Sequence, residues 1–265
     1  MSIAIKVSGL NVKYKVDNKV VNAVNNVSFS LDRKKILGII GETGSGKSSL
    51  IRSLNGLIKE PGIVEFKDLQ ILDSHGINND FKFENLRGKN VGFIPQNPFG
   101  SLNPIYKISK QFEFVNKRHK IYEISEFNFQ VLRALKEVGI NDPERVANSY
   151  SFELSGGMAQ RVVIALANFS NPEIIFADEP TTGLDVTVER QLLDKFFELV
   201  DSNNLTLIIV THDLGIVAQY CDETIVMLNG EIVEKGSVMN VFKNPQNEYT
   251  QKLIKASNEE ISWNF

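Results

Sequence analysis

The sequence predicts an α/β fold with a mostly parallel sheet. Three continuous apolar runs indicate its strands, namely KILGII at 35–40, EIIFA at 173–177 and LTLIIV at 205–210. Such runs are typical of central parallel strands that are buried on both faces. Helical patterns separate the runs along the chain. Strands that alternate with helices predict right-handed crossovers, which return each strand to the same sheet.

The periodicity of apolar side chains predicts the secondary structure of the remaining segments. Residues 3–31 alternate apolar and polar side chains and predict strands with turns, including the polar KVDNK loop at 15–19. Residues 66–90 are polar, and we expect them to be irregular. From about 98 to 150 the pattern becomes helical, and FNFQVLRALKEVGI places four aliphatic side chains on one face. This helical segment is a candidate subdomain.

Composition limits the class of protein. The 265 residues suit one large domain, or one domain with a small subdomain. The net charge of −3 and the lack of a basic run argue against nucleic acid as a partner. Cys221 is the only cysteine, which excludes a disulfide framework and a cysteine-ligated metal cluster. The N-terminus does not resemble a signal peptide, and no apolar run is long enough to span a bilayer. We therefore expect a cytoplasmic protein that can dock on a membrane protein.

The segment GIIGETGSGKSSLIRSL at 38–54 contains a candidate phosphate-binding loop. Gly41, Gly46, Lys47 and Ser48 fit the pattern G-x-x-x-x-G-K-[ST]. Glycines allow backbone N–H groups to converge on phosphates, and the N-terminus of the following helix adds partial positive charge. The lysine would reach the β and γ phosphates, and the serine would bind Mg²⁺. A flexible glycine turn is the alternative, but the strand before and the helix after favour a phosphate loop.

Two further strand ends carry chemically suitable side chains. Asp178 and Glu179 follow EIIFA, where the aspartate would hold Mg²⁺ through water and the glutamate would act as general base. His212 follows the third apolar run, and its neutral imidazole would bind a γ-phosphate oxygen. Alone, the acidic pair would favour a solvated surface and the histidine a structural role. Since ligands bind at the carboxyl ends of parallel strands, three such ends together favour a functional site.

A phosphate loop alone fits a kinase, a GTPase or a helicase, and the turn LSGGMAQR at 154–161 distinguishes between these classes of nucleotide-binding protein. It is a second glycine-containing turn before a helix, and hence a second anion site. One nucleotide has no use for two such sites in one subunit, whereas a symmetric dimer would offer this turn to its partner's ATP. With these motifs, the sequence resembles the ATPase subunit of an ATP-binding cassette (ABC) transporter over roughly residues 4–255.

The resemblance implies a domain organisation. The fold would be a P-loop NTPase core with a mostly parallel sheet, an N-terminal antiparallel β-subdomain and an inserted α-helical subdomain, the ABC ATPase fold. The ABC ATPase domain would span 1–257, with the helical subdomain at about 97–160 and a loosely ordered tail at 258–265. The helical subdomain would receive the coupling helices of the membrane subunits.

The resemblance also implies roles for individual residues. Tyr14 would stack on adenine, although a packing tyrosine on an edge strand remains the alternative. Gln96 would touch Mg²⁺ and the attacking water, and Asp185 belongs to a loop that communicates across the dimer. The expected cofactor-binding residues are Tyr14, Gly41, Glu42, Thr43, Gly44, Ser45, Gly46, Lys47, Ser48, Ser49, Ser155, Gly156, Gly157 and Asp185. The expected catalytic residues are Gln96, Glu179 and His212, and the expected Mg²⁺ ligands are Ser48, Gln96 and Asp178.

Several segments narrow the resemblance to the D-type ATPase of oligopeptide, dipeptide and nickel importers. They are QNPFGSLNP at 96–104, DEPTTGLDVTVE at 178–189, NPQNEYTQKLIKA near the C-terminus, and the turn above with its methionine at 158. Departures from the family pattern are Lys34 with Lys35, and Ser151 with Phe152. None of these touches an atom expected to contact phosphate. A single cysteine cannot form the C-terminal cysteine cluster that many longer relatives carry.

We therefore expect an ATP-hydrolysing subunit of a bacterial importer, bound to the cytoplasmic face of the membrane and using ATP with Mg²⁺. Its expected partners are a second ATPase subunit (an F-type paralogue or a copy of itself), two transmembrane permease subunits and, indirectly, an extracellular solute-binding protein. The alternatives are a soluble ABC ATPase of DNA repair or translation, a phosphoryl-transfer kinase, and a catalytically weak regulatory subunit. Peptides, nickel and metal–opine chelates remain open as solutes.

Overall fold

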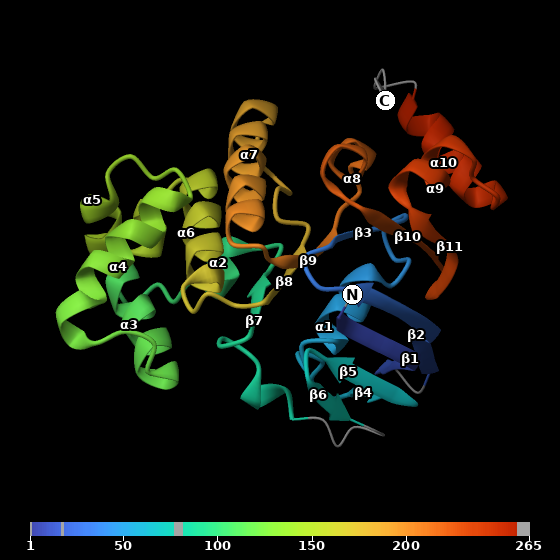
Figure 1. Cartoon of the computed structure of the whole chain (residues 1–265), viewed down its shortest axis with the longest axis horizontal. Helices are drawn as coiled ribbons and strands as arrows, with labels where there is room; N and C mark the ends of the chain where they lie inside the picture. The colour runs from blue at the N-terminus through green and yellow to red at the C-terminus, as the bar shows by residue number, and fades with distance from the viewer. Residues whose placement is uncertain (1, 17–18, 77–81, 259–265) are drawn as a thin grey trace. The chain divides into compact units, whose positions relative to one another are not determined.

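The computed structural model describes residues 2–16, 19–76 and 82–258. The chain divides into two compact units (Figure 1). The first contains Met1–Glu84 and Thr206–Phe265, and the second contains Asn85–Leu205. The second unit is wider than the helical subdomain expected at about 97–160, because it also includes two strands and the helix that follows them.

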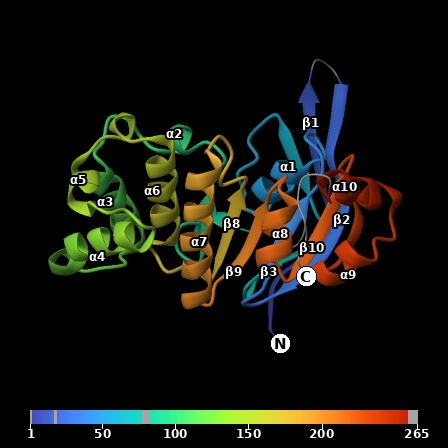
Figure 2. The same ribbon diagram turned by 90° about the horizontal axis from the view of Figure 1, so that it is seen from above.

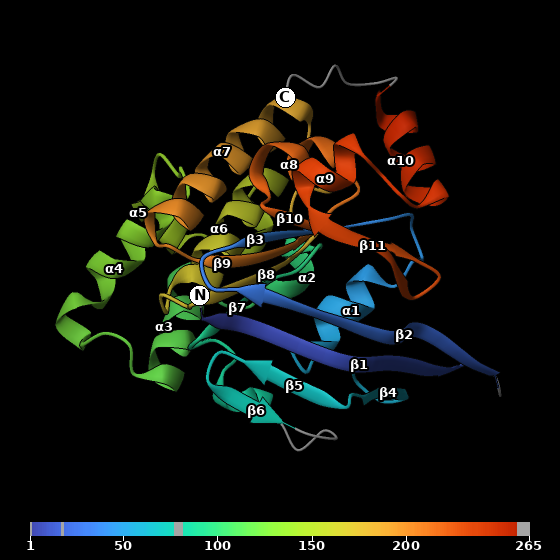
Figure 3. The same ribbon diagram turned by 45° about the vertical axis from the view of Figure 1, so that its right-hand side comes forward.

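The N-terminal part of the first unit is an antiparallel sheet built around one long strand, β1 (Ile3–Val16). It pairs antiparallel with β2 (Lys19–Asp32), β4 (Gly62–Glu65) and β5 (Asp68–Ile71), and β5 pairs with β6 (Ser74–Gly76) (Figure 3). The antiparallel β-subdomain is thus confirmed.

Two local expectations in this region were wrong. The segment 66–90 is not irregular throughout, because β5 and β6 lie within it and η1 (Phe83–Asn85) follows. The loop expected at 15–19 is wrong at its ends, since β1 extends to Val16 and β2 begins at Lys19, while residues 17–18 lie outside the described residues. Polar side chains misled the prediction here, because the strands at this edge are half exposed and carry polar residues.

The parallel strands of the first unit carry the phosphate loop. The strand β3 (Ile36–Ile40) pairs in parallel with β9 (Thr206–Val210) on one side and with β10 (Glu223–Leu228) on the other. The last of these forms an antiparallel hairpin with β11 (Glu231–Ser237). Every residue of β9 is buried, as the continuous apolar run predicts.

Helices cover both faces of these strands. The helix α1 (Lys47–Ser53) lies on one side, and α8 (Leu214–Tyr220), α9 (Val238–Lys243) and α10 (Glu248–Asn258) lie on the other (Figures 1 and 3). An apolar cluster joins the last three helices to the strands. Its buried members are Ile40, Leu214, Val217, Val226, Val238, Val241, Phe242 and Ile254. Most of the tail predicted at 258–265, namely 259–265, lies outside the described residues.

The second unit combines two parallel strands with helices. The strand β7 (Val91–Ile94) pairs in parallel with β8 (Ile174–Asp178). The helix α6 (Gly156–Asn168) leads into β8, and α7 (Val186–Ser202) follows it. Among the described residues of the whole chain, no helix is both long and apolar enough to cross a membrane.

The segment predicted to be helical forms a group of helices beside α6 (Figure 2). They are α2 (Pro98–Ser101), α3 (Ile108–His119), α4 (Ile124–Glu137) and α5 (Pro143–Asn148), followed by the 3₁₀ turn η2 (Ser151–Glu153). Val131 and Leu135 of α4 are buried, as the periodicity predicts. The ring of Phe112, which is fully buried, packs edge to face on Phe169 with centroids 4.8 Å apart.

Candidate functional site

The loop between β3 and α1 has a backbone that requires glycine at two places. Gly41 has φ 146° and Gly46 has φ 101°. A Cβ atom at Gly41 would lie 2.2 Å from the carbonyl oxygen of Met227, and one at Gly46 would lie 2.2 Å from that of Ala23. Side chains larger than hydrogen do not fit, so the loop packs directly against neighbouring strands.

Lys47 lies inside this loop and is almost fully buried. Its Nζ donates to the carbonyl oxygens of Gly41 at 2.7 Å and Glu42 at 2.8 Å, and lies 3.4 Å from Ser45 Oγ. The loop therefore curls around an ammonium group. A buried ammonium beside a glycine-rich backbone suits the recognition of a polyanion such as a triphosphate.

The rest of the predicted loop is accessible to a ligand. Glu42, Thr43 and Gly44 are exposed, and a Cβ atom at Gly44 would meet no atom within 4 Å. Ser48 and Ser49 are half-buried in the first turn of α1. The loop is thus fixed where it meets the strands and open at its tip.

Tyr14 lies beside the first turn of α1, the helix that follows the phosphate loop. It belongs to β1, and its hydroxyl is 3.3 Å from Ser49 Oγ. The ring is half-buried, with its edge near Gly62. Its stacking on adenine stays a prediction.

His212 lies at the same edge of the sheet as Gly41. Ile39 of β3 pairs with Val210 of β9 in parallel register, and the N–H of Thr211 donates to the carbonyl oxygen of Ile39 at 3.2 Å. His212, which is exposed, is therefore the second residue after the buried strand. The structure brings this predicted residue and the phosphate loop to one sheet edge.

Asp213, which the sequence reasoning missed, fixes the backbone after His212. Its Oδ1 accepts from the N–H groups of Gly215 at 2.6 Å and Ile216 at 3.4 Å, so it caps α8. An aspartate just before an apolar helical segment is a typical N-terminal cap, so this role could have been predicted from the sequence.

In the second unit, β8 ends in the two predicted carboxylates. Asp178 is fully buried. Glu179 is half-buried and has φ 46°, a left-handed conformation that residues other than glycine adopt rarely. Such strained backbone is common where a side chain must point in a direction set by function.

Glu179 is oriented by two side chains. Its Oε2 accepts from Nε2 of Gln96 at 3.0 Å and from Oγ1 of Thr182 at 2.8 Å. The structure thus joins two predicted catalytic residues, Gln96 and Glu179, that are far apart in sequence. Thr182 was missed, because its hydroxyl is one of two in TTG and nothing in the sequence distinguishes them.

The glycine turn at 155–157 forms the start of α6. Ser155 is exposed, and its Oγ accepts from the N–H of Met158 at 3.3 Å. A Cβ atom at Gly157 would lie 2.6 Å from Cγ1 of Val188 in α7. Asp185 caps that helix by accepting from the N–H of Val188 at 3.0 Å. The structure therefore brings the turn and the Asp185 loop together.

The expected Mg²⁺ ligands come from three separate places in the sequence. Among the described residues, no group of three or more His, Cys, Asp or Glu could hold a metal by itself. Ser48, Gln96 and Asp178 offer hydroxyl, amide and carboxylate oxygens, the donor types that Mg²⁺ prefers. In nucleotide sites this ion takes few protein ligands and completes its shell with phosphates and water, so these residues fit.

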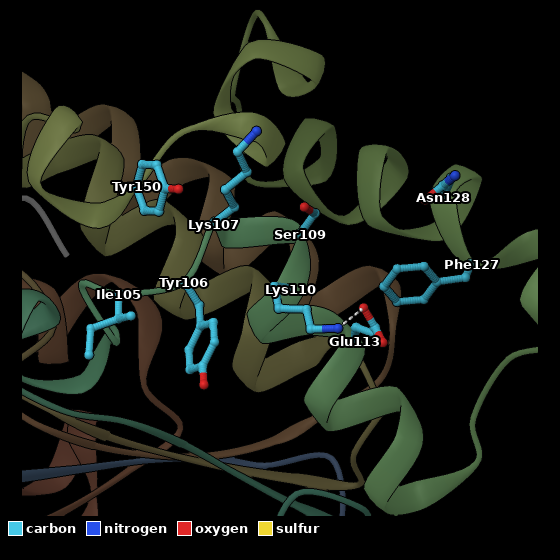
Figure 4. Close-up of a pocket in the computed structure, with 9 residues that line it drawn as sticks. All are labelled: Ile105, Tyr106, Lys107, Ser109, Lys110, Glu113, Phe127, Asn128 and Tyr150. Atoms are coloured by element: carbon cyan, nitrogen blue, oxygen red, sulfur yellow. Dashed lines mark hydrogen bonds and ion pairs between the residues drawn. The ribbon is translucent and has the colours of Figure 1, made fainter.

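A hollow of about 410 Å³ opens on the helical segment (Figure 4). Its lining residues are Ile105, Tyr106, Lys107, Ser109, Lys110, Glu113, Phe127, Asn128 and Tyr150. Ile105 is 76% exposed and Tyr106 40% exposed. Nζ of Lys110 forms an ion pair with Glu113 at 2.8 Å. The surface thus offers large apolar side chains beside charge, a composition typical of protein contacts.

A phosphate loop and a glutamate after a buried strand are typical of a protein that hydrolyses nucleotides. The second glycine turn, at 155–157, is typical of the ABC ATPases among these proteins. The sequence model of the ABC transporter family matches residues 24–182, and the chain belongs to this family. Members of this family hydrolyse ATP with Mg²⁺. The resemblance to ABC transporter ATPases and the fold class, both predicted from the sequence, are confirmed.

Several relatives are named as ATP-binding proteins of oligopeptide or dipeptide transport. The chain is 38% identical over 250 residues to the oligopeptide transport ATP-binding protein OppD of Lactococcus lactis subsp. cremoris, covering 94% of this chain and 74% of that protein. It is 40% identical over 256 residues to the dipeptide transport ATP-binding protein DppD of the same subspecies, covering 94% and 72%.

A solved structure agrees with this assignment. A dimeric post-hydrolysis state of the ATP-binding cassette MJ0796, bound to ADP and Pi, superposes with a TM-score of 0.77. It is 25% identical, and the match covers 88% of this chain and 98% of that one.

Proposed function

We propose that this chain is the ATP-hydrolysing subunit of an importer for oligopeptides or dipeptides, held at the cytoplasmic face of the membrane by its partners. The observation that carries the proposal is 37–40% identity, over most of the chain, to ATP-binding proteins of oligopeptide and dipeptide transport. Nickel is the second solute class, since the segments at 96–104 and 178–189 also resemble nickel importers.

The phosphate loop binds the triphosphate in this proposal. Lys47 exchanges its bonds to the Gly41 and Glu42 carbonyls for the β and γ phosphates, and Tyr14 stacks on the adenine. His212 donates a hydrogen bond to a γ-phosphate oxygen. Ser48, Gln96 and Asp178 would hold Mg²⁺, which would supply charge neutralisation at the phosphates.

Glu179 is the general base of hydrolysis. It accepts a proton from a water molecule whose oxygen forms a bond to the γ phosphorus, while the bond from that phosphorus to the bridging oxygen of ADP breaks. ADP departs with the electron pair, and the proton passes to the phosphate product. Gln96 and Thr182 hold the carboxylate in place, which the distances of 3.0 and 2.8 Å to Oε2 support.

A second ATPase subunit completes the site. The turn at 155–157 contacts the ATP of the opposite subunit, and the Asp185 loop packed against its helix carries the signal between the two sites. The partner is an F-type paralogue or a second copy. Two permease subunits bind the hollow of Figure 4 through their coupling helices, and a solute-binding protein delivers the solute from outside.

Reconstitution tests the proposal. The chain is combined with its permease and ATPase partners in proteoliposomes, and uptake of di- and oligopeptides is compared with uptake of nickel. We expect ATP-dependent peptide uptake, which the Glu179→Gln variant abolishes. Uptake of nickel without peptide would correct the solute class, and ATP hydrolysis without import of either solute would contradict an importer.

A further inference from the structure

The phosphate loop is held from the C-terminal part of the chain at two points. The hydroxyl of Tyr249, in α10, accepts from the backbone N–H of Glu42 at 2.9 Å. The N–H of Gly230, in the turn between β10 and β11, donates to the carbonyl oxygen of Ser45 at 3.0 Å. These bonds join the loop to residues roughly two hundred positions later, and only one of them uses a side chain.

Tyr249 is itself firmly placed. Its ring packs against the apolar cluster that contains Val238, Val241 and Ile254. Its own N–H donates to Oδ1 of Asn247 at 2.9 Å. Because both the ring and the backbone are fixed, the hydroxyl meets the loop at a set position.

Glu234 fixes the entry to α10 from the neighbouring strand β11. Its Oε1 accepts from the N–H of Gln246 at 2.8 Å, and its Oε2 accepts from that of Asn247 at 3.1 Å. A continuous series of bonds thus runs from β11 through the start of α10 to the phosphate loop. Burial, and also the negative charge of Glu42, raise the pKa of Tyr249, so the side chain stays a neutral phenol at neutral pH.

We infer that Tyr249 is a positioning residue for ATP binding, which acts by holding the phosphate loop in its ligand-ready conformation. The inference rests on the proposed role of the loop in binding triphosphate. A loop that is already ordered loses less conformational freedom when the ligand binds, and this raises affinity. Since the hydroxyl touches the backbone and not the reacting atoms, its loss affects binding and leaves the chemical step unchanged.

The Tyr249→Phe variant of the full chain tests the inference, because it removes one oxygen and keeps the ring in its apolar setting. We expect the Kd for ATP, measured by titration calorimetry, to rise about two- to tenfold. In the assembled transporter, KM for ATP should rise by the same factor while kcat stays within about twofold. Amide hydrogen exchange at Glu42 should accelerate in the absence of nucleotide.

Tyr122→Phe is the matched control. Its hydroxyl donates to the carbonyl oxygen of Phe169 at 3.2 Å, so this variant loses a comparable tyrosine hydrogen bond within the second unit. We expect an unchanged Kd for ATP. If Tyr249→Phe binds ATP like wild type, or if both variants weaken binding equally, the inference is wrong while the proposed function stands. If the wild-type chain binds no ATP, or binds it as well after Lys47→Ala, the loop assignment fails and the inference with it.

Discussion

The phosphate loop and the Glu179 carboxylate are built in different ways. The loop holds Lys47 with carbonyl oxygens five and six residues away, so nearby backbone sets the position of this cation. Glu179 is held by side chains, and one of them, Gln96, lies 83 residues earlier. ATP binding therefore depends mainly on backbone shape and one cation, whereas hydrolysis depends on side-chain hydrogen bonds to Glu179. Conservative substitutions should separate the two functions.

Lys47→Ala should have the largest combined effect, because it weakens ATP binding as well as turnover. The β and γ phosphates lose a preorganised cation, and the loss of one such donor lowers turnover by roughly 10²–10³-fold. ATP titration and steady-state hydrolysis measure the two effects. If ATP affinity and hydrolysis were both unchanged, the phosphate-loop assignment would be wrong and the segment would be a flexible glycine turn.

The residues that orient Glu179 should give a smaller loss, which for Thr182 is confined to turnover. Gln96→Ala or Thr182→Val removes a hydrogen bond to a charged group, which is worth about 1.5–3 kcal/mol. We expect hydrolysis to fall about tenfold or more for Thr182→Val, with the Kd for ATP within twofold of wild type. Ser202→Ala, which removes a hydroxyl bonded to the Leu199 carbonyl oxygen in the same unit, is the control. Equal losses in that control would show a general loss of stability.

The packing between α6 and α7 can be tested by stability alone. Gly157→Ala places a Cβ atom 2.6 Å from Val188, and such overpacking costs about 1–3 kcal/mol. Gly156→Ala is the matched control, since its Cβ atom would lie 3.9 Å from Leu184. Denaturant titration should show a lower free energy of unfolding for the first variant only. Equal stability of the two would mean that the turn and the Asp185 loop are not packed closely.

Tyr14→Phe should have the smallest effect. It keeps the ring that would stack on adenine and removes only the contact with Ser49 Oγ. We expect the Kd for ATP to change by less than about threefold. Tyr14→Leu should weaken binding more, because base–aromatic stacking is worth about 1–3 kcal/mol. Equal affinities of the two variants would favour the packing role of this tyrosine.

The same contrast explains what the sequence could predict. The sequence predicts the loop glycines, Lys47 and the buried strands β3, β8 and β9, because contiguous residues determine each of these features. Thr182 as a partner of Glu179, and Tyr249 as a partner of Glu42, were not readable, because only the fold brings them into contact. The strands β5 and β6 were missed, since polar side chains on a partly exposed sheet weaken the apolar pattern.

Hydrolysis by the Glu179→Gln variant tests the central claim most directly. The substitution keeps the size of the side chain and removes the base, and a positioned base is worth about 10²–10⁴ in rate. Binding and turnover of ATP are measured on the same preparation, with wild type beside it. The account predicts a Kd for ATP within twofold of wild type and hydrolysis lowered at least about a hundredfold. Turnover within twofold of wild type would contradict it.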